Sequence, residues 1–357
     1  MKPISVAVVG TGWCGGIRAE TLAAHALVKE LHIAETRAER LAELRQKLNP
    51  ASAVADYREL LKKDIDAVYI SATPESTHYP MAKDFLSAGR HVFLEKPIAM
   101  TLREADELIK IAKDKKLKFT IGYSQRFNPK YAYVRKCIRD ATIGRPVTAL
   151  VSRHITRMLG TKISGRSKLS PAAMEATHDL DFLFWCLEPA KPVRVYSQVN
   201  YGALQEQIGS SSGGSVPDQQ WVMVTMDNGV SIVVGGGWSL PLGYPNFSST
   251  WIEMVGTEGA VMVDDSHKDV IVNTVARGMQ LPMSTMPGEF VDHTYAGPMA
   301  PETIHFLEAV VYDRPVMVTP EQARMVMEVY IAADLSAERN EPVSLPLSDV
   351  KKVRAAA

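Results

Sequence analysis

The chain has 357 residues, and its 40 lysines and arginines balance 40 aspartates and glutamates. The length predicts two domains, while the even charge gives no field that favours nucleic acid or an anionic membrane. No apolar run approaches the roughly 20 residues of a membrane span, and no basic region precedes a hydrophobic signal core. Three cysteines, far apart, form neither a disulfide framework nor a zinc pattern. We expect a cytoplasmic protein that acts on a small molecule, without nucleic-acid or membrane partners.

The first element of the chain is a strand that leads into a glycine turn. Val6–Val9 is apolar, the turn reads Gly10-Thr11-Gly12-Trp13-Cys14-Gly15, and Ile17–Ala24 has helical spacing. A buried strand, a Gly-x-Gly-x-x-Gly turn and a helix together predict a dinucleotide site. The pyrophosphate would lie at the helix N-terminus, where unpaired N–H groups favour negative charge.

The second strand supports this interpretation. It runs Leu31–Ala34 and is followed by Glu35, 25 positions after Gly10. A carboxylate at this point accepts hydrogen bonds from the adenosine ribose and repels a 2′-phosphate, so the sequence favours NAD. The nearby Arg37 and Arg40 could soften that repulsion, and NADP therefore stays an alternative.

The remainder of the first third alternates strand and helix, which is typical of a doubly wound parallel sheet. The further predicted strands are 67–71, 92–94 and 119–122, and the predicted helical stretches are 17–27, 37–47, 57–61, 79–88 and 102–113. We place an NAD(P)-binding Rossmann domain at 1–124.

After residue 124 the pattern changes to an α+β domain, predicted over 125–357, with a large open mixed, mainly antiparallel sheet. Helices are expected at 129–139, 172–187, 301–311 and 320–338, and strands at 147–154, 194–201, 219–226, 230–235, 250–255 and 260–264. Asp227-Asn228-Gly229 is a hairpin signal between two of these strands. The basic segment before the second helix and residues 203–218 are expected to be loops.

A lysine follows the fourth strand of the Rossmann domain, in Glu95-Lys96-Pro97. Ligands of doubly wound folds gather outside the carboxyl ends of the strands. A partly desolvated lysine beside a positively charged nicotinamide gives up its proton more readily, which suits proton transfer to and from a hydroxyl. Proline lowers the penalty for a cis bond, and we predict a cis Lys96–Pro97 bond.

A second polar group lies on the predicted helix 172–187. His178 and Asp181 are three residues apart and share a face, which Glu175 extends by one turn. We expect this group to bind a hydroxylated substrate. A metal site made of these three side chains is a weaker alternative, because no second histidine is nearby, and our prediction is no metal.

Together these motifs resemble the Gfo/Idh/MocA oxidoreductases, the family of glucose–fructose oxidoreductase and inositol dehydrogenase. The resemblance covers essentially the whole chain and rests on motifs in the family's order. They are the glycine turn, Glu35, Ala72-Thr73-Pro74 with His78, Glu95-Lys96-Pro97, His178-x-x-Asp181, Val255–Gly259 and the closing segment Ala332–Ser336 with Pro342-Val343.

The resemblance implies site residues. Lys96 would be catalytic and contact the nicotinamide ribose, His178 would be a catalytic acid/base or substrate ligand, and Asp181 would support substrate hydroxyls. The cofactor path would include Ala72, Thr73, Pro74, His78, Glu95 and Tyr123, besides the glycine turn, Glu35 and Arg37. The C-terminal sheet would pack against a second subunit, which implies a homodimer or homotetramer.

One position departs from the family pattern. Many members carry an aspartate four residues before the histidine, where this chain has Met174. The nearest carboxylate is Glu175, and a one-residue offset turns an α-helical side chain by about 100°. The sequence leaves open whether Glu175 replaces the missing aspartate.

We therefore predict an NAD(P)-dependent dehydrogenase that oxidises a secondary alcohol of a sugar or cyclic polyol, or reduces the ketone. The substrate-binding candidates are Asp181, Arg126, Arg153 and Glu175. One alternative is a dehydrogenase of a dihydrodiol or ring carboxylate, because the acid-free segment Ser152–Lys168 carries Arg153, His154, Arg157, Lys162, Arg166 and Lys168 and could clamp an anion. Another is a dinucleotide-bound regulator without turnover.

Overall fold

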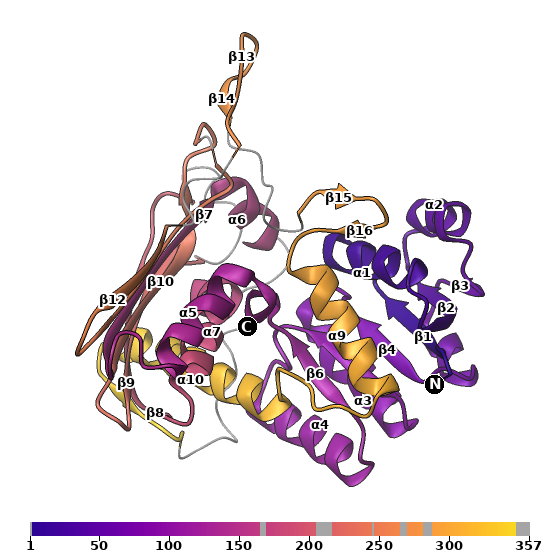
Figure 1. Ribbon diagram of the computed structural model, residues 1–357, viewed down its shortest axis with the longest axis horizontal. Coiled ribbons are helices and arrows are strands. Elements are labelled where there is room, and N and C mark those ends of the chain that lie inside the picture. Colours follow the sequence, from indigo (N-terminus) through magenta and orange to yellow (C-terminus); the bar gives the residue numbers. More distant parts are fainter. Residues whose placement is uncertain are drawn as a thin grey trace. The chain divides into compact units, whose positions relative to one another are not determined.

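The computed structural model describes residues 2–164, 169–204, 216–244, 246–264, 270–280 and 288–347 (Figure 1). Its contacts separate two compact units, the first made of Met1–Phe127 with Thr285–Arg324 and the second of Asn128–Ser284 with Met325–Ala357. The first boundary lies close to the one expected from the sequence. The later segment Thr285–Arg324 differs from that expectation, because it packs with the N-terminal unit.

The first unit contains a six-stranded parallel sheet in the order β3-β2-β1-β4-β5-β6. The strands are β1 Ile4–Val9, β2 Val28–Ala34, β3 Ser52–Val54, β4 Ala67–Ile70, β5 His91–Glu95 and β6 Phe119–Gly122. Strand order reverses at β1, as in a Rossmann fold, so the carboxyl ends of β1 and β4 lie where doubly wound folds bind their ligands. The predicted doubly wound sheet is confirmed, and β3 is a strand that the sequence analysis did not identify.

Helices connect these parallel strands. They are α1 Trp13–Ala23, α2 Ala38–Leu48, the 3₁₀ helices η1 Tyr57–Lys62, η2 Glu75–Thr77 and η3 Ser124–Phe127, α3 His78–Ser87 and α4 Leu102–Asp114. Helix α4 begins with a capping box, in which Thr101 and Glu104 satisfy each other's backbone N–H groups. The segment that returns from the end of the chain adds the short strands β15 Phe290–Val291 and β16 Thr294–Tyr295 and helix α9 Met299–Val311.

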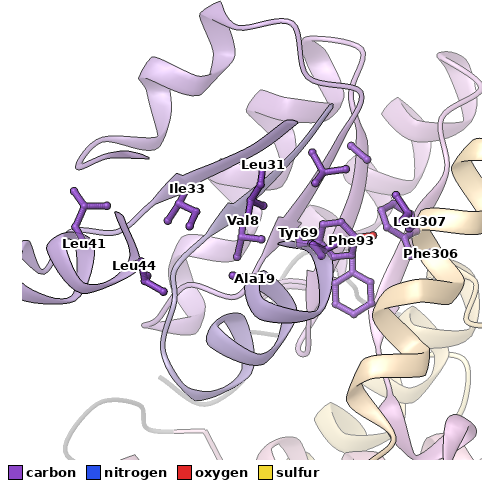
Figure 2. Packing of buried hydrophobic residues seen from close by; sticks show 13 residues of the cluster. Val8, Ala19, Leu31, Ile33, Leu41, Leu44, Tyr69, Phe93, Phe306 and Leu307 are labelled. Carbon is purple, nitrogen blue, oxygen red and sulfur yellow. The ribbon is translucent and has the colours of Figure 1, made fainter. Parts of the chain in front are cut away.

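Helix α9 completes the core of the first unit. Figure 2 shows Phe306 and Leu307 of α9 beside Tyr69 and Phe93 from the parallel sheet. The Phe306 ring meets Tyr69 edge-on at 5.3 Å between centroids and Phe93 at 5.8 Å. Such aromatic pairs add to the free energy gained from burial alone. Residues nearly 300 positions after the first strand thus close its hydrophobic core.

The second unit contains a seven-stranded sheet in the order β12-β11-β7-β10-β9-β8-β17. Neighbouring strands are antiparallel except β7 and β10, which are parallel, so the predicted mixed, mainly antiparallel sheet is confirmed. The strands are β7 Pro146–Thr156, β8 Pro192–Asn200, β9 Gln219–Met226, β10 Ser231–Leu240, β11 Ser248–Gly256, β12 Ala260–Asp264 and β17 Val343–Ser344. The hairpin predicted at Asp227-Asn228-Gly229 joins β9 to β10.

The helices of this unit are α5 Pro129–Arg139, α6 Arg157–Ser164, the π-helix η4 Ala172–Ala176 and α7 Thr177–Leu187, while α10 Pro320–Arg339 begins in the first unit. A separate hairpin pairs β13 Val272–Thr274 with β14 Gly278–Gln280. One prediction was wrong, because the loop expected after β7 begins with α6. The helix predicted at 172–187 is confirmed, and its first turn is π-helical. None of the described helices is long and apolar enough to cross a membrane.

Candidate functional site

The glycine turn after β1 is shaped by two close backbone approaches. Gly10 has φ +78°, and a Cβ on it would lie 2.7 Å from the Cα of Ala72. A Cβ on Gly15 would lie 1.9 Å from the Gly10 carbonyl oxygen. Both positions therefore require glycine, the first for its left-handed conformation and the second for contact between α1 and the turn.

The N-terminus of α1 has room for an anion. Gly12 is the N-cap residue and carries no side chain that could cap the helix, and its Cβ position has no atom within 4 Å. Trp13 is exposed and Cys14 is half-buried. The backbone N–H groups of the first helical turn can thus meet a pyrophosphate, and this end of the sheet fits a dinucleotide.

Glu35 lies at the end of β2, is 5% exposed and is tied to the glycine turn. Its Oε2 accepts hydrogen bonds from Thr11 N at 3.0 Å and Thr11 Oγ1 at 2.6 Å, while its Oε1 accepts from Arg37 N and Nε at 2.9 and 3.0 Å. Burial alone would raise the pKa of Glu35, but the hydrogen bonds from Arg37 and Thr11 outweigh it and lower the pKa to about 2. Glu35 is therefore an ionised acceptor beside the turn.

The loop after β4 is fastened by His78. Its Nδ1 lies 2.8 Å from the Pro97 carbonyl oxygen, and its Nε2 lies 3.0 Å from the Ala72 carbonyl oxygen. His78 is buried, whereas Thr73 and Pro74 are exposed. The histidine thus joins the loops that follow β4 and β5, and both of these loops contain predicted cofactor contacts.

The Glu95-Lys96-Pro97 turn lies at the carboxyl end of β5. The Lys96–Pro97 bond is cis, as predicted. Lys96 is half-buried, and the preceding Glu95 accepts hydrogen bonds from the fully buried Arg18 of α1. Tyr123, after the neighbouring strand β6, is buried. The turn therefore places Lys96 at the sheet edge where doubly wound folds bind their ligands.

The predicted polar helix belongs to the second unit. His178 is half-buried near the start of α7, and Asp181 is fully buried. Glu175 is also buried and accepts a hydrogen bond from Trp238 Nε1 of β10 at 2.7 Å. Because Glu175 lies in a π-helical turn, the 100° offset expected for an α-helix does not describe its position relative to His178.

Two candidate arginines are engaged within their own units. Arg153 is 7% exposed and binds Asp179 with both ends of its guanidinium, Nε to Oδ2 at 2.7 Å and Nη2 to Oδ1 at 2.6 Å. Arg126 is buried and donates from Nη1 to the Met317 carbonyl oxygen at 2.8 Å and to Gln322 Oε1 at 3.0 Å. Burial and these protein partners favour a structural role for both arginines, and the expectation that they bind substrate stays a prediction.

The rest of the basic segment offers little more to an anion. Arg157 donates from Nε to the Ser239 carbonyl oxygen at 3.1 Å, and Lys162 is exposed on α6. Arg166 and Lys168 lie outside the described residues. Among the residues that the structure describes, no group of three histidine, cysteine or acidic side chains could hold a metal ion.

The sequence analysis missed Arg18, Asp179, Trp238 and Glu302. Each is buried and bonded to a candidate residue or to Arg18 itself. An arginine in the helix that follows a glycine turn was a usable signal, because a buried guanidinium needs carboxylate partners. Its partners are 77 and 284 residues away, and no local pattern identifies them.

Comparison with known proteins gives consistent results for both halves of the chain. Residues 4–123 match the family model "Oxidoreductase family, NAD-binding Rossmann fold", and residues 131–262 match "GFO/IDH/MocA C-terminal domain". The chain is 26% identical to a myo-inositol 2-dehydrogenase of Thermotoga maritima, over 95% of this chain and 98% of that protein. It is also 26% identical to a scyllo-inositol 2-dehydrogenase (NADP(+)) of Bacillus subtilis, over 74% of this chain and 77% of the other.

The fold also matches solved structures. One is scyllo-inositol dehydrogenase from Lactobacillus casei with bound NAD(H) and scyllo-inositol, with a TM-score of 0.81 at 20% identity. The match covers 96% of this chain and 99% of that one. At this level of identity the likeness establishes a common fold over nearly the whole length.

Proposed function

Since this chain belongs to the Gfo/Idh/MocA family of NAD-binding oxidoreductases, we propose that it is a dehydrogenase of a cyclic polyol or sugar. It would transfer hydride between the nicotinamide and a secondary alcohol or the corresponding ketone. The observation that carries the proposal is Lys96, which is half-buried at the carboxyl end of β5 in the same unit as the glycine turn. The inositol dehydrogenases among the relatives support the substrate class.

Bound NAD supplies the hydride acceptor, and the protein must move the hydroxyl proton. We assign that proton transfer to Lys96, whose amine accepts the proton when the alcohol is oxidised and returns it when the ketone is reduced. The fixed position of its neighbours suits this task. Glu95 is held by Arg18, and the Pro97 carbonyl oxygen is held by His78, so the backbone on both sides of Lys96 is anchored.

We assign a second proton-handling or hydrogen-bonding role to His178. It is only half-buried, whereas its neighbours Thr177 and Asp179 are fully buried, so among these three residues it is the one within reach of a small molecule. Asp181, three residues further along the same helix, would orient His178 or a substrate hydroxyl.

We propose NAD as the preferred cofactor. An ionised Glu35 accepts hydrogen bonds from ribose hydroxyls and repels a 2′-phosphate. The Arg37 side chain, 62% exposed and paired with Glu35, is the group that would favour NADP if it left this ion pair. Since one relative is named for NADP(+), the preference has to be measured.

We infer that the working enzyme is a homodimer or homotetramer formed through the seven-stranded sheet. One row across this sheet aligns Met223, Val233, Leu150, Glu253 and Met262. Met223 is 51%, Leu150 38% and Met262 59% exposed. Apolar side chains gathered on one exposed sheet face are typical of a protein interface, and a second copy of the same face could cover them. Three unpaired cysteines agree with a cytoplasmic location, which we also propose.

The test is a spectrophotometric screen of NAD and NADP reduction with inositols, aldoses, uronates and dihydrodiols. We expect turnover with polyols or sugars. Lys96→Ala and His178→Ala should each lower kcat at least about tenfold, because proton transfer contributes roughly 10²–10⁴-fold, while the dissociation constant for NAD stays nearly unchanged. Glu175→Gln should lower kcat much less, since the Glu175 carboxylate accepts a hydrogen bond from Trp238 Nε1. Full turnover by Lys96→Ala would refute the proposed function.

The same screen tests an anionic or aromatic-derived ring as substrate. That alternative depends on the basic segment Ser152–Lys168 binding an anion. One of its arginines, Arg153, is already paired with Asp179. A uronate or dihydrodiol oxidised faster than every neutral polyol would nevertheless favour it.

A further inference from the structure

The helical segment that carries His178 is enclosed everywhere except at that residue. Over 169–187, every residue other than His178 is buried. This segment contains the π-helical turn η4, Ala172–Ala176, and α7, Thr177–Leu187, which follows it without a break. Because close packing surrounds the rest of the segment, the way in which the helix is wound and held decides where the His178 side chain lies.

The π-helical turn ends two residues before His178. π-Helices are rare, and they occur mostly as single turns within α-helices, frequently at functional sites. The wider winding of such a turn displaces every residue that follows it, compared with an uninterrupted α-helix. The position of His178 therefore depends on whether η4 keeps its π-helical form.

A glycine of β10 makes one of the contacts that hold η4. A Cβ on Gly236 would lie 2.9 Å from the backbone nitrogen of Ala176 and 3.0 Å from the Ala176 Cβ. Only a residue without a side chain lets the end of the π-helical turn lie this close to the sheet. The neighbouring Gly235 faces the other side of the sheet, where a Cβ would lie 2.4 Å from the Trp221 ring.

Two hydrogen bonds hold the same turn. Trp238, which is also in β10, is fully buried and donates from Nε1 to Glu175 Oε1 at 2.7 Å. Gln220 of β9 is fully buried as well, and its Oε1 accepts a hydrogen bond from the backbone nitrogen of Ala172 at 3.0 Å. The Gln220 amide is itself fixed, because its Nε2 donates to Asp334 Oδ1 of α10 at 3.1 Å. Two strands of the sheet thus hold η4 at its beginning and at its end.

We propose that Gly236, Trp238 and Gln220 are positioning residues for His178. They keep the turn before α7 π-helical and thereby direct the one residue of 169–187 that is not buried. This inference rests on the proposed function, in which His178 transfers the substrate proton or forms a hydrogen bond with the substrate. Because all three residues are buried, their effect on the reaction passes through η4 and His178.

The experiment is a double-mutant cycle on kcat for the best polyol. Gly236→Ala places a methyl group against Ala176 and should displace η4 from β10. We expect kcat to fall at least about fivefold, because a misplacement of about 1 Å can lower a rate by as much as roughly 10²-fold. In a His178→Ala background the same change should lower kcat by less than about twofold, since the side chain that it misplaces is gone.

Gly235→Ala is the matched control, because it adds the same methyl group to the same strand on the opposite face of the sheet. It should leave kcat unchanged in both backgrounds, even if the displaced Trp221 ring lowers the melting temperature. A purely structural role of Gly236 would lower kcat by the same factor with and without the His178 imidazole. Equal factors in the two backgrounds, or an unchanged kcat, would overturn the proposal.

A second variant and a second measurement keep the test independent of one protein preparation. If Gly236→Ala fails to fold, Trp238→Phe takes its place in the cycle, because it keeps an aromatic ring but removes the N–H group that donates to Glu175. NMR of the histidine imidazoles needs no turnover, and the His178 signals are assigned by their loss in His178→Ala. They should move in Gly236→Ala and Trp238→Phe but not in Gly235→Ala, and signals that stay in place in both variants would contradict the positioning role.

The outcomes separate this inference from the function on which it rests. If His178→Ala loses turnover but the variants of β10 act equally with and without the imidazole, the positioning role is wrong and the proposed function stands. If His178→Ala keeps full turnover, the role proposed for His178 in the reaction fails, whatever the imidazole signals show.

Discussion

Replacement of Arg153 should destabilise the second unit without weakening substrate binding. Arg153 of β7 and Asp179 of α7 form two parallel charged hydrogen bonds at 2.7 and 2.6 Å, and Asp179 has no exposed surface. In Arg153→Met a side chain of similar length fills the space, but the Asp179 carboxylate is left buried without its guanidinium. The free energy of unfolding then falls mainly because a buried carboxylate has lost its counter-charge, and not because a cavity has formed.

Loss of one partner of a buried ion pair costs about 3–5 kcal/mol. The upper half of this range applies here, because Asp179 is fully buried and loses two charge-assisted bonds at once. With a urea m-value of roughly 3 kcal/mol/M, the midpoint of the transition should fall by about 1.3–1.7 M. The double variant Arg153→Met/Asp179→Leu removes both charges and should recover most of that loss, since an apolar pair of similar volume often replaces a buried ion pair without penalty.

The assay is urea unfolding followed by tryptophan fluorescence, combined with KM for the best polyol. Fluorescence is suitable because Trp185 lies on the same helix as Asp179, and Trp238 lies on β10, which pairs with β7. An Arg153→Met protein that unfolds at the wild-type urea concentration but has a KM raised tenfold or more would refute the structural role and restore Arg153 as a substrate ligand.

Three further predictions concern the cofactor, the thiol and the sheet face. Glu35→Ala should lower the ratio of the NADP dissociation constant to the NAD dissociation constant, because it removes the carboxylate that repels a 2′-phosphate. Calorimetry measures both constants, and an unchanged ratio would contradict the role of Glu35. Since burial raises the pKa of Cys14 to about 12, iodoacetamide at pH 8 should alkylate it about 10³-fold more slowly than an ordinary thiol, and faster alkylation on raising the pH should be visible by mass spectrometry; labelling at the ordinary rate would show that the thiol is not shielded. Leu150→Glu should shift the light-scattering mass towards the monomer, with Lys115→Glu in the first unit as control, and an unchanged mass would exclude this face as the interface.

The sequence predicted the elements whose cause is local. Alternation of apolar strands with amphipathic helices identified five of the six strands of the parallel sheet, and Asp227-Asn228-Gly229 identified the hairpin between β9 and β10. The missed edge strand β3 has only three residues, all of them half-buried, so it shows no apolar run. The sequence analysis did not identify the π-helical turn before α7. This turn has five residues, too few for their apolar pattern to distinguish a π-helix from an α-helix.

The sequence predicted the candidate site less completely, because side-chain partners are set by the tertiary fold. Spacing alone identified Glu35 as an acid close to the glycine turn, and the structure bonds it to Thr11. Arg153 is predicted to bind substrate because it stands in a segment without acids, and the structure adds a partner that the segment does not contain, Asp179, 26 residues later on helix α7. The pattern of charges along the sequence does not reveal this ion pair, because its two members are 26 residues apart.

The return of α9 to the first unit has a consequence during synthesis. Arg18 leaves the ribosome 284 residues before Glu302, and Phe93 leaves it 213 residues before Phe306, the residues with which they pack. At roughly 5–20 residues per second, the nascent N-terminal unit waits about 10–60 s while Arg18 has Glu95 but not yet Glu302 as a partner and the aromatic surface is uncovered. Throughout that interval it is a natural client for a chaperone, and a ribosome stalled before residue 302 should hold a protease-sensitive Rossmann unit that becomes resistant once α9 has emerged.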